Sequence, residues 1–67
     1  MIVILNNRQE EISSESMTIS ELLQYRNFTF KMLVVKVNAE LIPKDKYQVQ
    51  RIKDGDDVMI LHLISGG

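Results

Sequence analysis

Cysteine is absent from this 67-residue chain, and so is tryptophan. Without cysteine the chain has no disulfide framework and no thiolate zinc site, and it has no thiol that could act as a nucleophile or carry a persulfide. Any chemistry that needs a thiol must therefore take place on another protein.

Long apolar runs are missing as well. The opening stretch MIVIL has five apolar residues and no basic region before it, and the last apolar stretch is interrupted by His62. Neither is long enough for a signal peptide or a membrane span, so we expect a soluble, cytoplasmic protein with no membrane partner.

Neither positive nor negative charge is in large excess, since the formal net charge is -1. Such a balance gives no general attraction to nucleic acid or to anionic lipid. Basic residues do concentrate between Arg26 and Lys53, but no aromatic residues alternate with the lysines there to form a stacking platform. We therefore expect no nucleic-acid partner.

The chain does contain enough apolar material for one small core, because 45% of its residues are hydrophobic. In the first half, MIVIL followed by Asn6 and Asn7 predicts a strand and a tight turn, since asparagine tolerates the left-handed backbone. RQEEIS then gives a weaker second strand, and SSES is interpreted as a polar connector.

A single helix is predicted next. Thr18 and Glu21 have the spacing of a capping box, in which each side chain accepts a hydrogen bond from the other residue's backbone N–H. Ile19, Leu22 and Leu23 then share one face, so the pattern predicts a short amphipathic helix over residues 19–26.

The second half returns to strand patterns. KMLVVKVN predicts a strand that ends at Asn38, and Pro43 limits the following segment to a short edge strand. A turn centred on Gly55 precedes an apolar strand that is typical of the middle of a sheet. The order of elements predicts an α+β fold with a mixed four- to five-stranded sheet and one main helix packed on one face.

One helix covers only one face of such a sheet, yet the first and last strands are apolar at consecutive positions. If Val3 and Val58 point to the helix, a second apolar set points away from it. An exposed apolar patch often marks a partner site, although loops or self-association could also cover it. The predicted partner-binding residues are Ile2, Ile4, Met59, Leu61 and Leu63.

The chain ends in Ser65, Gly66 and Gly67. Glycine adds nothing to packing and loses much entropy when ordered, so these residues are not expected to stabilise the fold. We predict a domain over residues 1–64 followed by a flexible, narrow tail over residues 65–67.

These landmarks resemble a known family. VNAELIPKDKY followed by IKDGDDVMILHLISGG is similar to the ThiS-like sulfur carrier proteins of thiamin biosynthesis, which share the Val-Asn, hydrophobic-Pro-basic, Asp-Gly-Asp and terminal Gly-Gly features. The resemblance implies the ubiquitin-like β-grasp fold. Lys44 stands where many relatives have arginine, and Ser65 where alanine or valine is also found.

The resemblance also implies a chemistry for the tail. A ubiquitin-activating-like, ThiF-like adenylyltransferase would use ATP and magnesium to adenylate the Gly67 carboxylate, and a persulfide donor would convert it to a thiocarboxylate. A ThiG-like thiazole synthase would then take the sulfur. The carrier itself would bind no cofactor and would be a substrate rather than an enzyme.

The remaining candidates for chemistry are few. His62 is the only histidine, and no nucleophile is paired with a base, so we expect no catalytic residues. Asp54, Asp56 and Asp57 lack the spacing of a calcium loop, so no metal site is expected. Two alternatives stay open: a carrier like the small subunit of molybdopterin synthase, and a ubiquitin-like binding module or modifier without sulfur chemistry.

Overall fold

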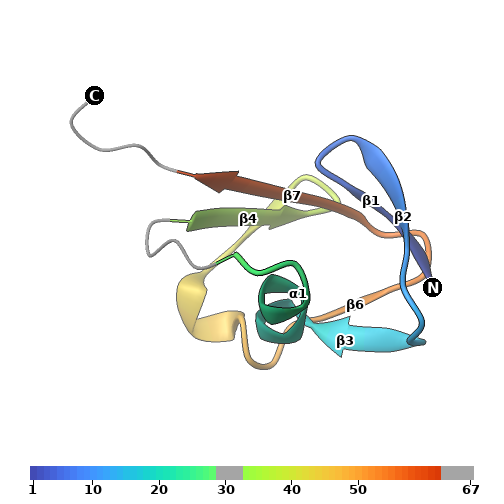
Figure 1. Cartoon of the computed structure of the whole chain (residues 1–67). Helices are drawn as coiled ribbons and strands as arrows, with labels where there is room; N and C mark the ends of the chain where they lie inside the picture. The colour runs from blue at the N-terminus through green and yellow to red at the C-terminus, as the bar shows by residue number, and fades with distance from the viewer. Residues whose placement is uncertain (29–32, 63–67) are drawn as a thin grey trace.

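The computed structural model describes residues 1–28 and 33–62 and has two sheets and one α-helix in that part of the chain (Figure 1). The larger sheet is mixed and has the order β2-β1-β7-β4-β5. Its strands are β1 (Ile2–Leu5), β2 (Arg8–Glu11), β4 (Leu33–Val37), β5 (Glu40–Ile42) and β7 (Asp57–His62). The predicted α+β class is confirmed.

The remaining elements lie on one side of this sheet (Figure 1). They are the helix α1 (Ile19–Tyr25), a two-stranded sheet of β3 (Ser16–Thr18) and β6 (Arg51–Lys53), and a single 3-10 turn η1 (Lys44–Lys46). The other side of the five-stranded sheet carries no element of the described chain.

The β1–β2 hairpin forms as predicted. Leu5 pairs with Arg8, and the two residues between them, Asn6 and Asn7, have φ values of 50° and 67°. Two consecutive positive φ values are those of a type I′ turn, whose twist matches the twist of the flanking strands. Two asparagines supply that backbone without glycine.

The capping box that begins α1 is also confirmed. The Thr18 N–H donates to Glu21 Oε1 at 2.7 Å, and the Glu21 N–H donates to Thr18 Oγ1 at 3.1 Å. The two bonds satisfy backbone groups that have no partner inside the helix. The helix ends at Tyr25, with Arg26 as its C-cap.

Strand β7 occupies the middle of the sheet, as its apolar sequence predicts. It pairs antiparallel with β4, where Val35 lies opposite Ile60, and parallel with β1, where Leu5 lies opposite Val58. One set of its side chains enters the core beneath α1. The fully buried side chains of that core are Val3, Ile19, Leu22, Val35, Ile52 and Val58.

The pairing of β3 with β6 was not predicted from the sequence. The connector interpretation of SSES is wrong at Ser16, which pairs with Lys53 at the start of β3. Ile52 of β6 lies opposite Met17 and is completely buried. A three-residue strand with one buried residue has too short a pattern to be recognised, and its partner is far away along the chain.

In the described part of the chain, no helix is long and apolar enough to cross a bilayer, and this includes α1.

Candidate functional site

The side of the five-stranded sheet that faces away from α1 exposes a group of apolar side chains. Ile2 and Leu61 each keep 42% of their surface accessible, and Leu41 keeps 59%. The strand registers place their neighbours on the same side of the sheet. We call this surface the outer face; it consists of one lysine, Lys36, and the apolar residues Ile2, Ile4, Val34, Leu41, Met59 and Leu61.

Four of the five predicted partner-binding residues are brought together there. Ile2 and Ile4 come from β1, and Met59 and Leu61 come from β7, the strand beside it. The fifth, Leu63, lies outside the described residues. Ile2 and Leu61 are exposed, whereas Ile4 and Met59 are half-buried, and the binding role of all four stays a prediction.

Three members of the outer face were not predicted as partner-binding residues. Val34 lies opposite Leu61, and Lys36 lies opposite Met59 on one side and Leu41 on the other. The signal for Val34 was present in the alternation of β4, whose Val35 and Val37 are buried. Leu41 becomes part of the face because β5 pairs with β4, which its own three residues do not indicate.

A shallow hollow of about 340 Å³ lies on the outer face. Met59 and Leu61 line it together with Lys36, Asp57 and Ala39.

Ala39 has a φ of 70°, a left-handed backbone that costs a residue with a Cβ roughly 1 kcal/mol or more. Asn38 before it has a φ of 52°, so the β4–β5 turn is again left-handed at two consecutive residues.

The acidic residues after β6 form hydrogen bonds that hold the turn between β6 and β7. Asp56 is only 7% exposed, and its carboxylate accepts hydrogen bonds from Asn38 Nδ2 at 3.1 Å and from the Lys53 N–H at 2.9 Å. Asp54 Oδ1 accepts the Ile2 N–H at 2.6 Å. Among residues 1–28 and 33–62, no group of three or more His, Asp or Glu side chains could hold a metal ion.

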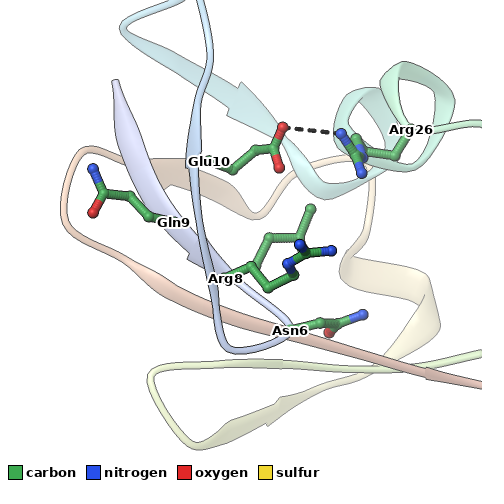
Figure 2. A pocket seen from close by; sticks show the side chains of 6 residues that line it. Asn6, Arg8, Gln9, Glu10 and Arg26 are labelled. Carbon is green, nitrogen blue, oxygen red and sulfur yellow. Dashed lines mark hydrogen bonds and ion pairs between the residues drawn. The ribbon is translucent and has the colours of Figure 1, made fainter.

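A second hollow, of about 480 Å³, lies beside the β1–β2 hairpin and is polar (Figure 2). Across it, Arg26 Nη1 of the α1 C-cap lies 2.9 Å from Glu10 Oε2 of β2, which ties the helix to the edge of the sheet. Gln9 points to the opposite side of the strand in Figure 2. Both charged partners are partly exposed, so we assign the pair a small, salt-sensitive contribution to stability.

Asn6 lines this hollow and also holds β7 in place. Its Oδ1 accepts the backbone N–H of Ile60 at 2.7 Å, and its own N–H donates to the Val58 carbonyl at 2.9 Å. The side chain thus continues the pairing of β1 with β7 beyond Leu5, the last residue of β1. Strand β7 is fixed in this way two residues before its end at His62.

The predicted tail residues Ser65, Gly66 and Gly67 lie outside the described part of the chain, so their assignment stays a prediction. What the described part provides is an exposed apolar face on the strand that leads toward them.

Comparisons with known proteins agree on one family. The sequence model of the ThiS family matches residues 3–67. The sulfur carrier protein ThiS of Bacillus subtilis is 30% identical over 63 residues, which are 94% of this chain and 96% of that protein. The ThiS protein of Escherichia coli is 25% identical over 64 residues, with 96% and 97% of the two chains covered.

A larger protein also matches. A thiazole synthase of Paramagnetospirillum magneticum is 31% identical over 67 residues, which are 100% of this chain but 20% of that enzyme. The chain therefore spans about a fifth of the length of that relative. Among solved structures, the crystal structure of the thiamine biosynthesis protein ThiS of Geobacter metallireducens covers all of both chains, with a TM-score of 0.90 and 26% identity.

Proposed function

This chain belongs to the ThiS family of sulfur carrier proteins, and from that membership we propose that its Gly67 carboxylate carries the sulfur used to form the thiazole of thiamin. The family match runs to residue 67 and so includes both terminal glycines. It is the observation on which the proposal rests.

The chemistry requires activation by a partner, because a carboxylate is a poor electrophile. A ThiF-like adenylyltransferase joins AMP from ATP to the carboxylate, with magnesium, and pyrophosphate leaves. The outer sulfur of a persulfide on the donor protein then attacks the acyl carbon and displaces AMP, which gives an acyl disulfide. A second thiol on the donor side reduces the S–S bond of this acyl disulfide, so that the thiocarboxylate is released and the two thiols leave as a disulfide. The carrier needs no cysteine for these steps. Gly66 and Gly67 have no Cβ, which allows the chain end to pass through a narrow opening to the nucleotide.

The carrier contributes recognition rather than catalysis in this proposal. The outer face docks on the adenylating partner, and the thiazole synthase receives the sulfur afterwards. The apolar side chains are exposed in a small domain that would otherwise hide them, which supports a docking role. Met59 adds a flexible side chain that can adapt to two different partners.

The number of residues between the outer face and Gly67 is compatible with this arrangement. Leu61 is the last described member of the outer face, and the chain runs on from it to Gly67. A fully extended chain advances at most about 3.3–3.6 Å per residue, so the six residues after Leu61 span at most roughly 20 Å. A partner that binds the outer face can therefore have its nucleotide site within reach of the tail.

Intact-protein mass spectrometry tests the proposal. The chain is incubated with ATP, magnesium, an adenylating enzyme of the ThiF type and a persulfide source. We expect a mass gain equal to the replacement of one oxygen by sulfur, located at Gly67 by fragmentation. A variant with one alanine added after Gly67 is the matched control, because it keeps the folded domain but moves the carboxylate, and it should show no gain.

Two results would contradict the proposal. One is an unmodified chain in a reaction where the same enzyme converts another carrier, which would favour a binding module without sulfur chemistry. The other is full conversion of the extended variant, because the position of the carboxylate would then be irrelevant.

A further inference from the structure

Lys36 is the only cationic member of the outer face. It lies on β4, an internal strand, with Met59 of β7 opposite it on one side and Leu41 of β5 on the other. Within residues 1–28 and 33–62 its ammonium group makes no hydrogen bond and no ion pair. The charge thus has apolar cross-strand neighbours on both sides and is exposed to water.

That arrangement has a consequence once a partner covers the outer face. An ammonium group that loses water without gaining a counter-charge costs several kcal/mol, so an apolar partner surface would be repelled at this position. The flanking residues Leu41 and Met59 belong to the same outer face. The negative counter-charge for Lys36 must then come from the partner.

We propose that the partner docked on the outer face presents a carboxylate to Lys36 from within an otherwise apolar contact. The inference rests on the proposed function, since it describes the surface of the adenylating enzyme. Lys36 then selects among partners, because a surface with an apolar or cationic group at this point binds less well. The carboxylate enters the hollow that Lys36 lines with Ala39, Met59 and Leu61.

Asp57 allows the charge of the partner group to be tested, because Asp57 lines the same hollow as Lys36. Its carboxylate forms no ion pair with Lys36 within the described part of the chain. A partner carboxylate that enters the hollow is attracted by Lys36 and repelled by Asp57. Removal of the Lys36 charge should therefore lower the affinity, whereas removal of the Asp57 charge should not lower it.

The experiment measures the dissociation constant between this chain and the adenylating enzyme of the same genome by isothermal titration calorimetry. Lys36→Met keeps the length and apolar stem of the side chain and should weaken binding by about tenfold, which corresponds to roughly 1.4 kcal/mol. Asp57→Asn should leave the affinity unchanged or raise it. Lys53→Met, on β6 of the second sheet, is the matched control and should bind like the parent chain.

The possible results separate the two proposals. If Lys36→Met binds as tightly as the parent or more tightly, or if Asp57→Asn weakens binding as much as Lys36→Met does, the partner does not present a carboxylate. The parent chain is followed in parallel by mass spectrometry. Its conversion to the thiocarboxylate with unchanged Lys36→Met affinity refutes this inference alone, whereas a parent chain that neither binds nor converts refutes the proposed function.

Discussion

Replacement of Asn6 by glycine removes the side-chain acceptor that holds the middle of β7. The Ile60 N–H donates to Asn6 Oδ1 at 2.7 Å, and Ile60 is 3% exposed, so the lost acceptor leaves a buried N–H without a protein partner. Glycine adopts the φ of 50° at this position without strain. The variant therefore tests the hydrogen bond separately from the turn conformation.

The magnitude follows from the burial of the donor. A buried N–H left without an acceptor costs about 1–3 kcal/mol. A domain of this length is stabilised by only about 3–10 kcal/mol in total, at 0.05–0.15 kcal/mol per residue. Asn6→Ala should be worse than Asn6→Gly by about 1 kcal/mol or more, because alanine also pays the left-handed backbone penalty. Asn6→Asp keeps an oxygen acceptor and should be the mildest of the three.

Urea denaturation gives the free energies of unfolding, and amide hydrogen exchange locates the effect. We expect faster exchange at Ile60 in the glycine variant, and a melting temperature lower by about 4–8 °C for each kcal/mol lost. Equal stability of the parent and glycine variants, with unchanged exchange at Ile60, would refute the reasoning that Asn6 fixes β7. Equal stability of the glycine and alanine variants would refute the argument from φ.

Three further predictions concern other parts of the fold. Ala39→Gly should raise the free energy of unfolding by about 0.5–1 kcal/mol in urea denaturation, because the φ of 70° suits glycine, and a destabilised variant would contradict this. The Thr18 N–H and hydroxyl lower the pKa of Glu21 below its ordinary value of 4.5, so NMR titration should show the carboxylate protonating at lower pH in the parent than in Thr18→Ala. Because the folded-state pKa is the lower one, the stabilisation from Glu21 is present above about pH 4.5 and is lost as the pH falls through the lowered value. Leu61→Asp should bind the adenylating enzyme at least about tenfold more weakly in calorimetry, yet keep the circular dichroism spectrum of the parent, since Leu61 is 42% exposed; unchanged affinity would show that the outer face is not the docking surface.

Local chemistry made most of the fold predictable. The Asn6-Asn7 turn and the Thr18/Glu21 capping box each depend on residues a few positions apart, and both are observed as predicted. The β3–β6 pair could not be predicted, because Ser16 and Lys53 lie far apart in the sequence and each strand has only three residues. Both the short pattern of these strands and the distance between them along the sequence made the difference.

The same distinction applies to the outer face. Alternation within a single strand was enough to predict that Ile2 and Leu61 are exposed. The apolar cross-strand neighbours of Lys36 could not be predicted in this way, because Leu41 and Met59 belong to two other strands. A single strand pattern gives the side on which a residue lies, whereas its neighbours on that side follow from the register.

The central place of β7 also determines when this surface can exist during translation. Strands β1 and β2 can form a hairpin early, and β4 and β5 can form another, but the two hairpins are joined only by the strand that is synthesised last among them. Ile2, Lys36 and Met59 share one surface only after that strand has inserted. A nascent or truncated chain that ends before β7 has no such surface, so an enzyme that recognises it selects chains whose folding is finished.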